Sequence, residues 1–234
     1  MNLENTNNVA FWKKIKENNP NKKLHFIHTP KCGGTYVRQI CKKLNIKHKK
    51  RGHQHLTQKS PHITFTVIRD PVKRFESLLN YRLSGKIRNN WPNHLRDVYD
   101  DPEISLNTIV RRMSNEDITG FHPYRTLCYW GNHVNIFITI DKLHEFLTFF
   151  GYHYNPQKFV TKKVSKKKRG TFSNQTIARV SRIFQNDIAF YKKKTGSSGE
   201  SVPVPVPETE TGIETKTVTE TDIKISTAKT GENV

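Results

Sequence analysis

The sequence predicts an α/β domain, a three-layer sandwich with a parallel sheet between helices. Three short apolar segments, at 24–28, 63–68 and 134–140, have the length and composition of buried strands. Each is followed by residues whose apolar side chains recur at helical spacing. Strands that alternate with helices are typical of parallel sheets covered on both faces.

The chain divides by composition into three parts. Residues 1–21 are polar and rich in Asn, and form a loose N-terminal arm or a capping helix. Residues 22–194 hold the predicted strands and helices and are the expected domain. Residues 195–234 lack aromatic side chains and repeat Val-Pro and Thr-Glu, so they bury too little apolar surface to offset the entropy cost of ordering. We expect a disordered, acidic, low-complexity tail there; a strand or two around 217–225 is the alternative.

The charge of the chain is strongly positive. Its 234 residues carry a formal net charge of +20, with 40 Lys and Arg against 20 Asp and Glu. A field of this sign attracts polyanions such as nucleic acids, charged glycans and phosphorylated small molecules. A solvated, Lys-rich surface would explain the same net charge, so the charge alone does not indicate a function.

Cysteine spacing and hydropathy indicate the compartment. The three cysteines, Cys32, Cys41 and Cys128, match neither a disulfide framework nor a zinc site. No apolar run reaches the roughly 18 residues that a membrane helix needs, and the first twenty or so residues contain no apolar stretch typical of a signal peptide. We expect a soluble protein without a membrane span, in a reducing compartment such as the cytoplasm.

The predicted elements follow in a simple order. The strand at 24–28 leads through a tight loop to a helix over 36–44, and the stretch 45–61 is basic, His-rich and irregular. After the second strand a helix is expected over 72–83, with Asp70 as its N-cap and Pro71 at its start. Further helices are expected over 105–113, 141–149 and 174–193, with a polar loop at 84–102 and a basic loop at 162–169.

The loop TPKCGGT, residues 29–35, joins a buried strand to a helix. Paired glycines allow a tight turn that directs successive N–H groups at an anion, and a helix N-terminus adds partial positive charge. Lys31 adds a full charge and Thr35 a hydroxyl. In the nucleoside-triphosphatase loop the lysine follows the glycines, whereas Lys31 precedes them. The loop is expected to bind phosphate or sulfate, or else is an ordinary turn that contains a lysine.

The second strand ends in the segment RDPVKRFES. Arg69 stands at the carboxyl end of the strand, where open α/β sheets bind ligands, and Ser77 follows about two helical turns later. An arginine fork and a hydroxyl can together hold one phosphate. The alternative is that Arg69 pairs with Asp70 or Glu76 while Ser77 faces solvent.

In combination, PKCGGT at 30–35 and TVIRDPVKRFESLLNYRL at 66–83 resemble the two nucleotide-binding motifs of the sulfotransferase superfamily. The likeness is greatest to the Golgi carbohydrate sulfotransferases, such as the heparan sulfate 2-O-sulfotransferases, and covers about residues 23–193. It implies a P-loop-like sulfotransferase fold. It also implies transfer of a sulfuryl group from 3′-phosphoadenosine 5′-phosphosulfate (PAPS) to an acceptor hydroxyl, expected to belong to a carbohydrate.

The resemblance also implies a role for each matched residue. Lys31 would bind the 5′-phosphosulfate and stabilise charge on the leaving oxygen, while Cys32 shapes the loop. Backbone and hydroxyl groups that bind the same phosphate would come from Gly33, Gly34, Thr35 and Tyr36.

The other matched segments would bind the rest of the nucleotide. Arg69 and Ser77 would hold the 3′-phosphate that distinguishes PAPS from ATP. The basic segment that ends in Lys168 and Arg169 would close over the nucleotide, or is only a solvated run of charge.

Sulfuryl transfer needs a base for the proton of the acceptor hydroxyl. The segment RGHQHLT at 51–57 offers His53 and His55, and histidine titrates near neutral pH. An HxH pair at this place is similar to that of the heparan sulfate 2-O-sulfotransferases, which implies His55 as the base and His53 as its partner or substitute. The alternatives are a surface pair and a metal-chelating pair, for which no further ligands have suitable spacing.

Two other classes of function use some of the same features. A phosphoryl-transfer enzyme needs carboxylates for Mg²⁺, and the nearest, Asp70, is placed to cap a helix. A non-catalytic module on the same fold would bind nucleic acid or glycan through its charge. The set Lys31, Arg69 and Ser77 favours metal-free sulfotransfer to an anionic or neutral glycan, with nucleic acid not expected as a partner. Without the anchor and disulfides of Golgi relatives, we expect a small cytoplasmic enzyme, of microbial origin or from a virus in its host cell.

Overall fold

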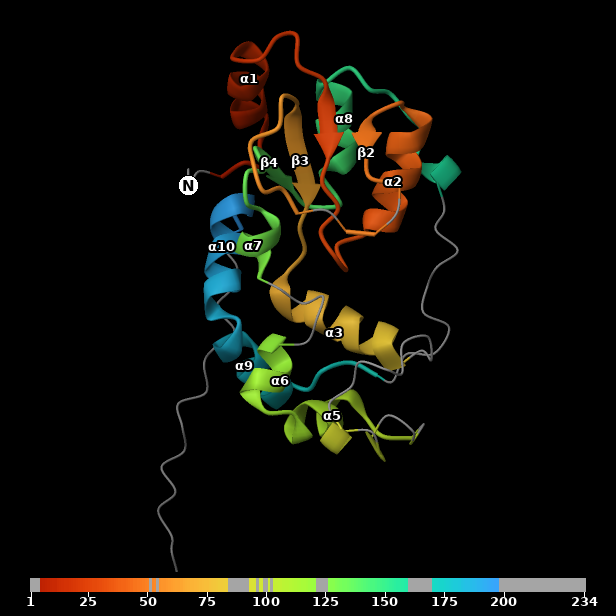
Figure 1. Ribbon diagram of the computed structural model, residues 1–234, viewed down its shortest axis with the longest axis vertical. Coiled ribbons are helices and arrows are strands. Elements are labelled where there is room, and N and C mark those ends of the chain that lie inside the picture. Colours follow the sequence, from red (N-terminus) through yellow and green to blue (C-terminus); the bar gives the residue numbers. More distant parts are fainter. Residues whose placement is uncertain are drawn as a thin grey trace, which may run out of the picture. The chain divides into compact units, whose positions relative to one another are not determined.

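Four parallel strands form one sheet in the part of the chain that the computed structural model describes, in the order β2-β1-β3-β4 (Figure 1). They are β1 (Leu24–Phe26), β2 (Lys47–His48), β3 (Ile63–Val67) and β4 (Ile136–Ile138). The described residues are 5–50, 52–53, 55–83, 93–95, 97–98, 101, 103–120, 126–159 and 170–197. The predicted α/β class with a parallel sheet is thereby confirmed.

One face of the sheet is apolar. Because side chains alternate along a strand, Phe26, Phe65 and Ile136 all lie on this face and are buried. Three helices cover it: α1 (Val9–Glu17), α2 (Gly34–Lys43) and α8 (Leu143–Phe149). This layer forms the core of the sheet half of the domain.

The opposite face is more polar. Here Thr64 Oγ1 donates a hydrogen bond to the side-chain oxygen of Asn135 at 2.7 Å, next to β4. Phe137 packs against Leu127 and Phe190, which belong to α7 (Leu127–Trp130) and α10 (Gln185–Thr195). Helices therefore flank the sheet on both sides.

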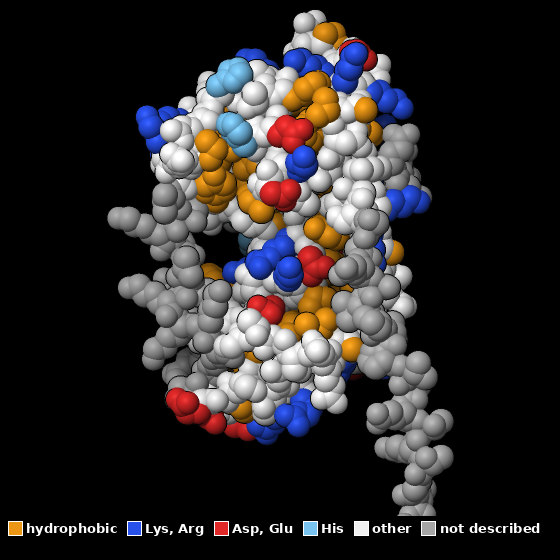
Figure 2. Space-filling view, turned by 180° about the vertical axis from the view of Figure 1, so that it is seen from behind, with side chains coloured by type: hydrophobic (Ala, Val, Ile, Leu, Met, Phe, Trp, Pro, Cys, Tyr) orange, Lys and Arg blue, Asp and Glu red, His pale blue; other side chains and the backbone are white. Residues whose placement is uncertain are grey.

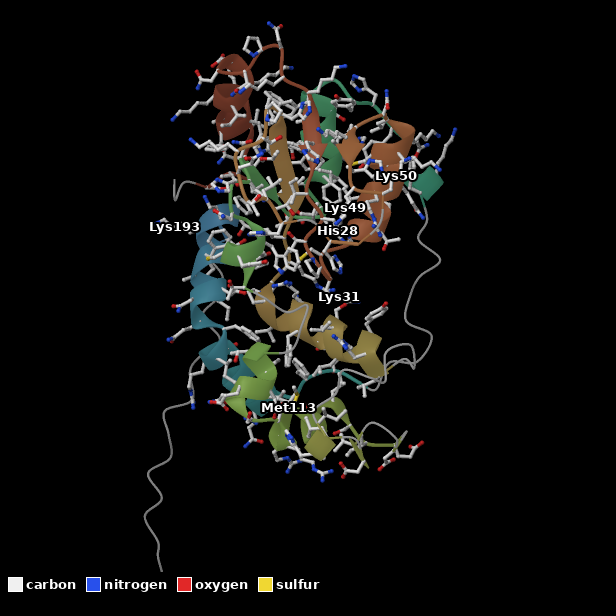
Figure 3. All side chains as sticks on the ribbon, in the orientation of Figure 1. His28, Lys31, Lys49, Lys50, Met113 and Lys193 are labelled. Atoms are coloured by element: carbon white, nitrogen blue, oxygen red, sulfur yellow. The ribbon has the colours of Figure 1, made fainter. Side chains whose placement is uncertain are left out.

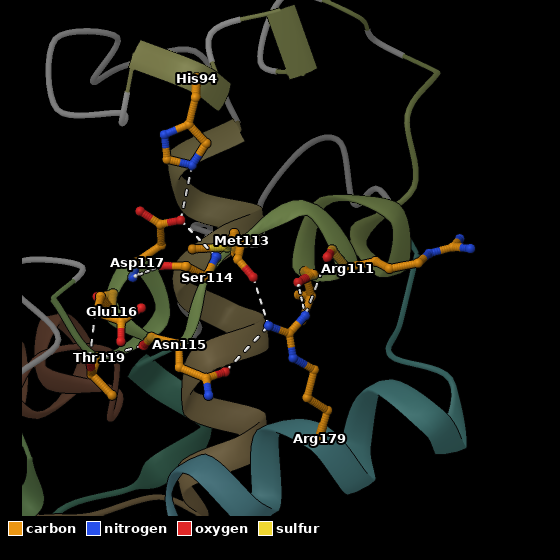
Figure 4. A network of polar contacts seen from close by, with 10 residues as sticks. His94, Arg111, Met113, Ser114, Asn115, Glu116, Asp117, Thr119 and Arg179 are labelled. Carbon is orange, nitrogen blue, oxygen red and sulfur yellow. Dashed lines mark hydrogen bonds and ion pairs between the residues drawn. The ribbon is translucent and has the colours of Figure 1, made fainter. Parts of the chain in front are cut away.

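A second apolar core lies beyond the carboxyl ends of the strands. It is built from α3 (Pro71–Tyr81), α5 (Leu106–Arg112), α6 (Asn115–Gly120) and α9 (Asn174–Ile183), and includes η3 (Asn93–Leu95) (Figure 1). Arg179 on α9 donates to the carbonyls of Val110 and Met113, both at 2.7 Å (Figure 4). Val110 O also accepts from Met113 N at 3.3 Å, so Arg179 adds donors at the C-terminal end of α5, where a helix has more backbone acceptors than donors.

Helix α3 begins as predicted. The side chain of Asp70 accepts a hydrogen bond from Lys73 N at 2.9 Å, and Pro71 is the first helical residue. The helix therefore starts directly where β3 ends, which fixes Arg69 between the two elements.

The N-terminal segment belongs to the domain. Trp12 of α1 is fully buried, and its Nε1 donates to Thr6 O at 2.7 Å. Thr6 Oγ1 in turn donates to Phe137 O and accepts from Phe137 N, at 2.8 and 2.9 Å. Residues 1–21 were expected to form either a loose arm or a capping helix. The structure shows a capping helix, and residues 5–21 pack as part of the domain.

Other elements differ from expectation in detail. The helix predicted over 174–193 is two helices, α9 and α10, which meet at the buried Phe184. The stretch 45–61, expected to be irregular, contains β2, which pairs with β1. The short helices α6, α7 and η4 (Pro156–Phe159) were not expected.

Some predictions fall outside the described residues. These are the tail beyond residue 197, most of the loop predicted at 84–102, and the basic loop at 162–169. Among the helices that the structure does describe, none has the length and apolar character to cross a membrane.

Candidate anion-binding site

The loop after β1 is held in an uncommon backbone conformation. Lys31 has φ of 60°, a left-handed geometry that costs a residue with a β-carbon about 1–2 kcal/mol. Neighbouring groups support it: Pro30 O accepts from Arg74 Nε at 3.1 Å and from Cys32 Sγ at 3.4 Å. Thr29 Oγ1 lies 2.8 Å from Thr66 Oγ1 of β3, so the loop is tied to the neighbouring strand as well.

Helix α2 starts at Gly33 with no side-chain cap. Gly33 has φ of 79° and is exposed. α8 and α10 likewise lack a side-chain cap, whereas five other helices, α1, α3, α5, α7 and α9, begin with a capping side chain, from Asn8, Asp70, Ser105, Thr126 and Ser173. An uncapped helix N-terminus presents backbone N–H groups and partial positive charge, the features that favour a bound anion.

Gly34 lies directly against the imidazole of His28. A β-carbon at position 34 would overlap the ring atoms Cδ2 and Nε2. His28 is 6% exposed and its Nδ1 lies 3.1 Å from Gly52 O. Because a carbonyl only accepts, Nδ1 carries the hydrogen in this contact. The glycine at position 34 is therefore required by the close approach of this ring, whereas the left-handed backbone of the loop falls at Lys31 and Gly33.

The two predicted motifs meet at Lys31 and Arg69. Burial, and then the positive charge of Arg69, lowers the pKa of Lys31 to about 8. The thiol of Cys32 accepts a hydrogen bond from the backbone of Arg69, and burial raises its pKa, so the thiol is neutral. Arg69 itself is exposed at the end of β3. Two cationic side chains thus share one edge of the sheet.

One face of α3 points at this loop. Arg74, Ser77 and Tyr81 are three and four residues apart, so they lie on one face of the helix. Arg74 contacts Pro30, and Lys31 Nζ lies 4.1 Å from the centre of the Tyr81 ring. Ser77, which is half-buried, lies between these two contacts. Lys31, which lies between the sheet and α3 (Figure 3), therefore borders both Arg69 and the face of α3 that carries Ser77.

The acids considered as alternative partners of Arg69 have other roles. Asp70 caps α3 through Lys73 N, and Glu76 Oε2 accepts from Phe172 N at 3.2 Å. These contacts favour a ligand-binding interpretation of Arg69.

The segment with the two predicted histidines lies between the first loop and α7. The His53 ring centre is 4.6 Å from that of His28 and 5.8 Å from that of Trp130. His55 stacks on Tyr129, with ring centres 4.1 Å apart and an interplanar angle of 8°. His53 is thus connected to Gly34 through His28, while His55 lies flat on α7.

A buried ion pair connects these parts. Arg74 and Asp187 are 0% and 2% exposed, with 3.9 Å between Nη1 and Oδ2. Both carboxylate oxygens of Asp187 accept from Leu127 N, at 2.9 and 3.0 Å, and burial raises the pKa of Asp187. The pair links Pro30 in the loop to the start of α7, the helix that carries the rings packed on the histidines.

The remaining predicted residues are placed as follows. Thr35 lies half-buried in the first turn of α2. Tyr36 N donates to Gly33 O at 2.9 Å, and its hydroxyl hydrogen-bonds to Tyr154, whose pKa is raised first by burial. Lys168 and Arg169 lie outside the described residues.

Sequence reasoning missed four residues that shape the site: His28, Arg74, Tyr81 and Asp187. His28 directly precedes the loop, but a histidine at the end of a buried strand is not in itself a signal. Arg74 and Asp187 interrupt the apolar faces of their helices, a pattern typical of a buried pair that sequence spacing cannot match.

Neither a metal site nor a known relative identifies the function of the described residues. In the described part of the chain, no group of three or more His, Cys, Asp or Glu is arranged to hold a metal ion. Comparison with models of protein families, with curated proteins and with solved structures found no match to this chain. We therefore infer the function of this chain from the residues of the site and their geometry.

Proposed function

We propose that the chain is a sulfotransferase that moves a sulfuryl group from PAPS to the hydroxyl of an acceptor, a carbohydrate. One observation carries the proposal: Lys31 and Arg69, from two motifs far apart in sequence, lie close enough at the carboxyl ends of β1 and β3 for their charges to interact. Ser77 is on the face of α3 whose Arg74 and Tyr81 contact the loop. Ligands of open α/β sheets bind at this edge.

The donor nucleotide would be bound through its two phosphate-bearing ends. The 5′-phosphosulfate would lie at the uncapped N-terminus of α2, with Lys31, Gly33, Gly34 and Thr35 around it. The 3′-phosphate would be held by Arg69 and the hydroxyl of Ser77. Burial and then the positive charge of Arg69 lower the pKa of Lys31, and an anion between the two side chains would relieve their mutual repulsion, which supports this assignment.

The proposed reaction is an in-line displacement at sulfur. The acceptor oxygen forms a bond to sulfur while the bond from sulfur to the 5′-phosphate oxygen breaks, and that oxygen keeps the electron pair. The hydroxyl proton passes to a histidine of the segment that holds His53 and His55. Lys31 and the α2 N-terminus stabilise the charge on the departing adenosine 3′,5′-bisphosphate. Alignment of the acceptor oxygen with the sulfur and the departing oxygen supplies the rest of the rate enhancement.

Calorimetry with the product nucleotide tests this proposal. Adenosine 3′,5′-bisphosphate should bind at least about tenfold more tightly than adenosine 5′-monophosphate, because charge-assisted contacts to a phosphate contribute about 1.5–3 kcal/mol. Arg69→Ala should remove this preference. Arg182→Ala, which removes an exposed arginine of α9, is the matched control and should keep it. Equal binding of the two nucleotides by the wild-type chain would rule out the PAPS site.

The second candidate function is a non-catalytic polyanion-binding module. Five lysines on α2, β2 and the residues after β2 are exposed, namely Lys42, Lys43, Lys47, Lys49 and Lys50. In the view from behind, however, basic side chains of the described residues lie among acidic and uncharged ones (Figure 2). Binding of single-stranded DNA or polyphosphate that weakens steeply with salt, together with no response to either nucleotide, would favour this candidate.

A further inference from the structure

His28 is fixed at both edges of its ring. Nδ1 donates to Gly52 O at 3.1 Å, and the Cδ2–Nε2 edge lies against the backbone of Gly34. With the hydrogen on Nδ1, Nε2 is unprotonated in the neutral ring. His28 therefore contacts both the start of α2 and the segment that carries the predicted base.

Three donors hold that segment in place. Gly52 O accepts from His28 and, at 3.4 Å, from Arg38 Nη1, while His53 O accepts from Lys49 Nζ at 3.3 Å. The ring of His53 packs against the rings of both His28 and Trp130. The backbone and the ring of His53 are thus both constrained, and the ring packs on His28, which itself lies against Gly34.

We propose that His28 is a positioning residue that holds His53 beside the phosphosulfate loop and so makes His53, and not His55, the base of the proposed transfer. This inference rests on the proposed function. The carrying observation is the chain of contacts from Gly34 through His28 to His53. His55 has one ring face covered by Tyr129 and lies against α7.

The charge state of His28 suits this role. Burial and then the neighbouring His53 lower the pKa of His28 to about 4, with Arg38 acting in the same direction and the hydrogen bond to Gly52 O against it. At neutral pH His28 is uncharged, so the proton taken from the acceptor hydroxyl stays on His53. Among the described residues, the charged side chains of Arg38 and Lys49 hold the backbone segment of His53.

Histidine-selective NMR on the full chain tests the inference without an identified acceptor. Saturation with adenosine 3′,5′-bisphosphate should raise the pKa of His53 by about one unit, because a nearby anion favours the protonated ring. The pKa of His55 should rise by less than half as much. His28→Leu should reduce the shift of His53 to that of His55, whereas His28→Asn, which keeps a donor near the position of Nδ1, should preserve it.

A second measurement follows the release of sulfate from PAPS to water. His53→Asn should slow it about 100-fold or more, the usual size of a general-base contribution, and His55→Asn less than tenfold. Nucleotide affinity should change less than about threefold in both variants and in His28→Asn, since none of these side chains is assigned to the nucleotide. His144→Asn, an exposed histidine of α8, is the control and should change neither the rate nor the pKa shifts.

The outcomes separate the two proposals. If the wild-type chain does not bind the bisphosphate, the sulfotransferase proposal itself fails. If it binds, but His55 shows the larger pKa shift or His55→Asn the larger loss of rate, the role of His28 and His53 is wrong and the nucleotide site stands. An unchanged shift of His53 in His28→Leu would likewise overturn the positioning role.

Discussion

The imidazole of His28 occupies the space that a β-carbon at Gly34 would need. This relationship brings the first turn of α2 and the end of β1 closer together than any other residue at position 34 would allow. It also connects the phosphate loop to the His53 segment, because the opposite edge of the same ring donates to Gly52 O.

Substitution Gly34→Ala should destabilise the fold. The added methyl group would displace a buried ring, and overpacking of this kind costs about 1–3 kcal/mol. Gly120→Ala is the matched control, because the site is helical and, in the described part of the chain, no atom outside its own helix backbone and chain neighbours lies within 4 Å of a β-carbon there; it should be neutral or stabilise by about 0.5 kcal/mol. Urea unfolding followed by circular dichroism measures both. Equal free energies of unfolding for the two variants would contradict the close approach.

Acid should destabilise the protein through His28. The pKa of His28 is about 4 in the folded protein against the ordinary histidine value of 6.5 in the unfolded chain, so between these values the unfolded chain binds a proton that the folded chain does not. The free energy of unfolding should therefore fall as pH decreases from 6.5 to about 4, by up to about 3 kcal/mol. His28→Asn should flatten this dependence in urea melts taken across the range. A dependence as steep as in the wild type would assign the effect to other groups.

Nucleotide binding should weaken with alkaline pH. The pKa of Lys31 in the free protein is about 8, so the ammonium that contacts the phosphosulfate loses its charge above that pH. Affinity for adenosine 3′,5′-bisphosphate should fall by up to about tenfold per pH unit between about pH 8 and pH 9.5. Lys31→Arg keeps its charge and should give a nearly flat profile by calorimetry. Parallel profiles for the two proteins would show that Lys31 is not the titrating group.

Trp12 should be essential to the sheet half of the domain. Trp12→Ala removes a fully buried indole that packs edge-on against Phe146, with ring centres 5.2 Å apart. A loss of about 3–5 kcal/mol in the free energy of unfolding is expected. Val9→Ala, on the same helix but 43% exposed, should change it by less than about 0.5 kcal/mol. If both substitutions changed the free energy of unfolding equally, α1 would be a loose arm that does not stabilise the domain.

The buried pair should tolerate joint replacement better than single replacement. Asp187→Asn leaves the Arg74 charge buried without its carboxylate, which should cost about 3 kcal/mol or more. The double variant Arg74→Met, Asp187→Leu should recover much of that stability. It should still lower nucleotide affinity, because Arg74 also donates to Pro30 O in the loop. A double variant no more stable than Asp187→Asn would contradict this account of the pair.

The sequence-based predictions worked where the signal is local. The strands β1, β3 and β4 and the start of α3 depend on short apolar runs bounded by Gly, Pro and a capping Asp, all readable in one segment. Strand β2 has two residues and no apolar pattern, so its conformation comes from pairing with β1. The burial of α1 similarly depends on a partner, the sheet, that lies far away in sequence.

The candidate site divides in the same way. Lys31, Arg69 and Ser77 could be proposed from the sequence because the two motifs that carry them occur together, each directly after a predicted strand. The roles of His28, Arg74 and Asp187 arise from contacts between segments separated by tens of residues, which no local pattern encodes. What the structure mainly adds to the sequence-based site is therefore the set of contacts that connect the predicted residues.

Thr6 connects the two ends of the described domain, since its N–H donates to Lys194 O at 3.0 Å while its hydroxyl bonds to Phe137. During synthesis, therefore, the strand next to Thr6 and the last helix both emerge long after Thr6 itself. Contacts of such sequence separation form slowly and late. A ribosome-bound chain shorter than 194 residues would leave the Phe137 side of the sheet open to solvent, and chaperones should engage this protein until α10 has emerged.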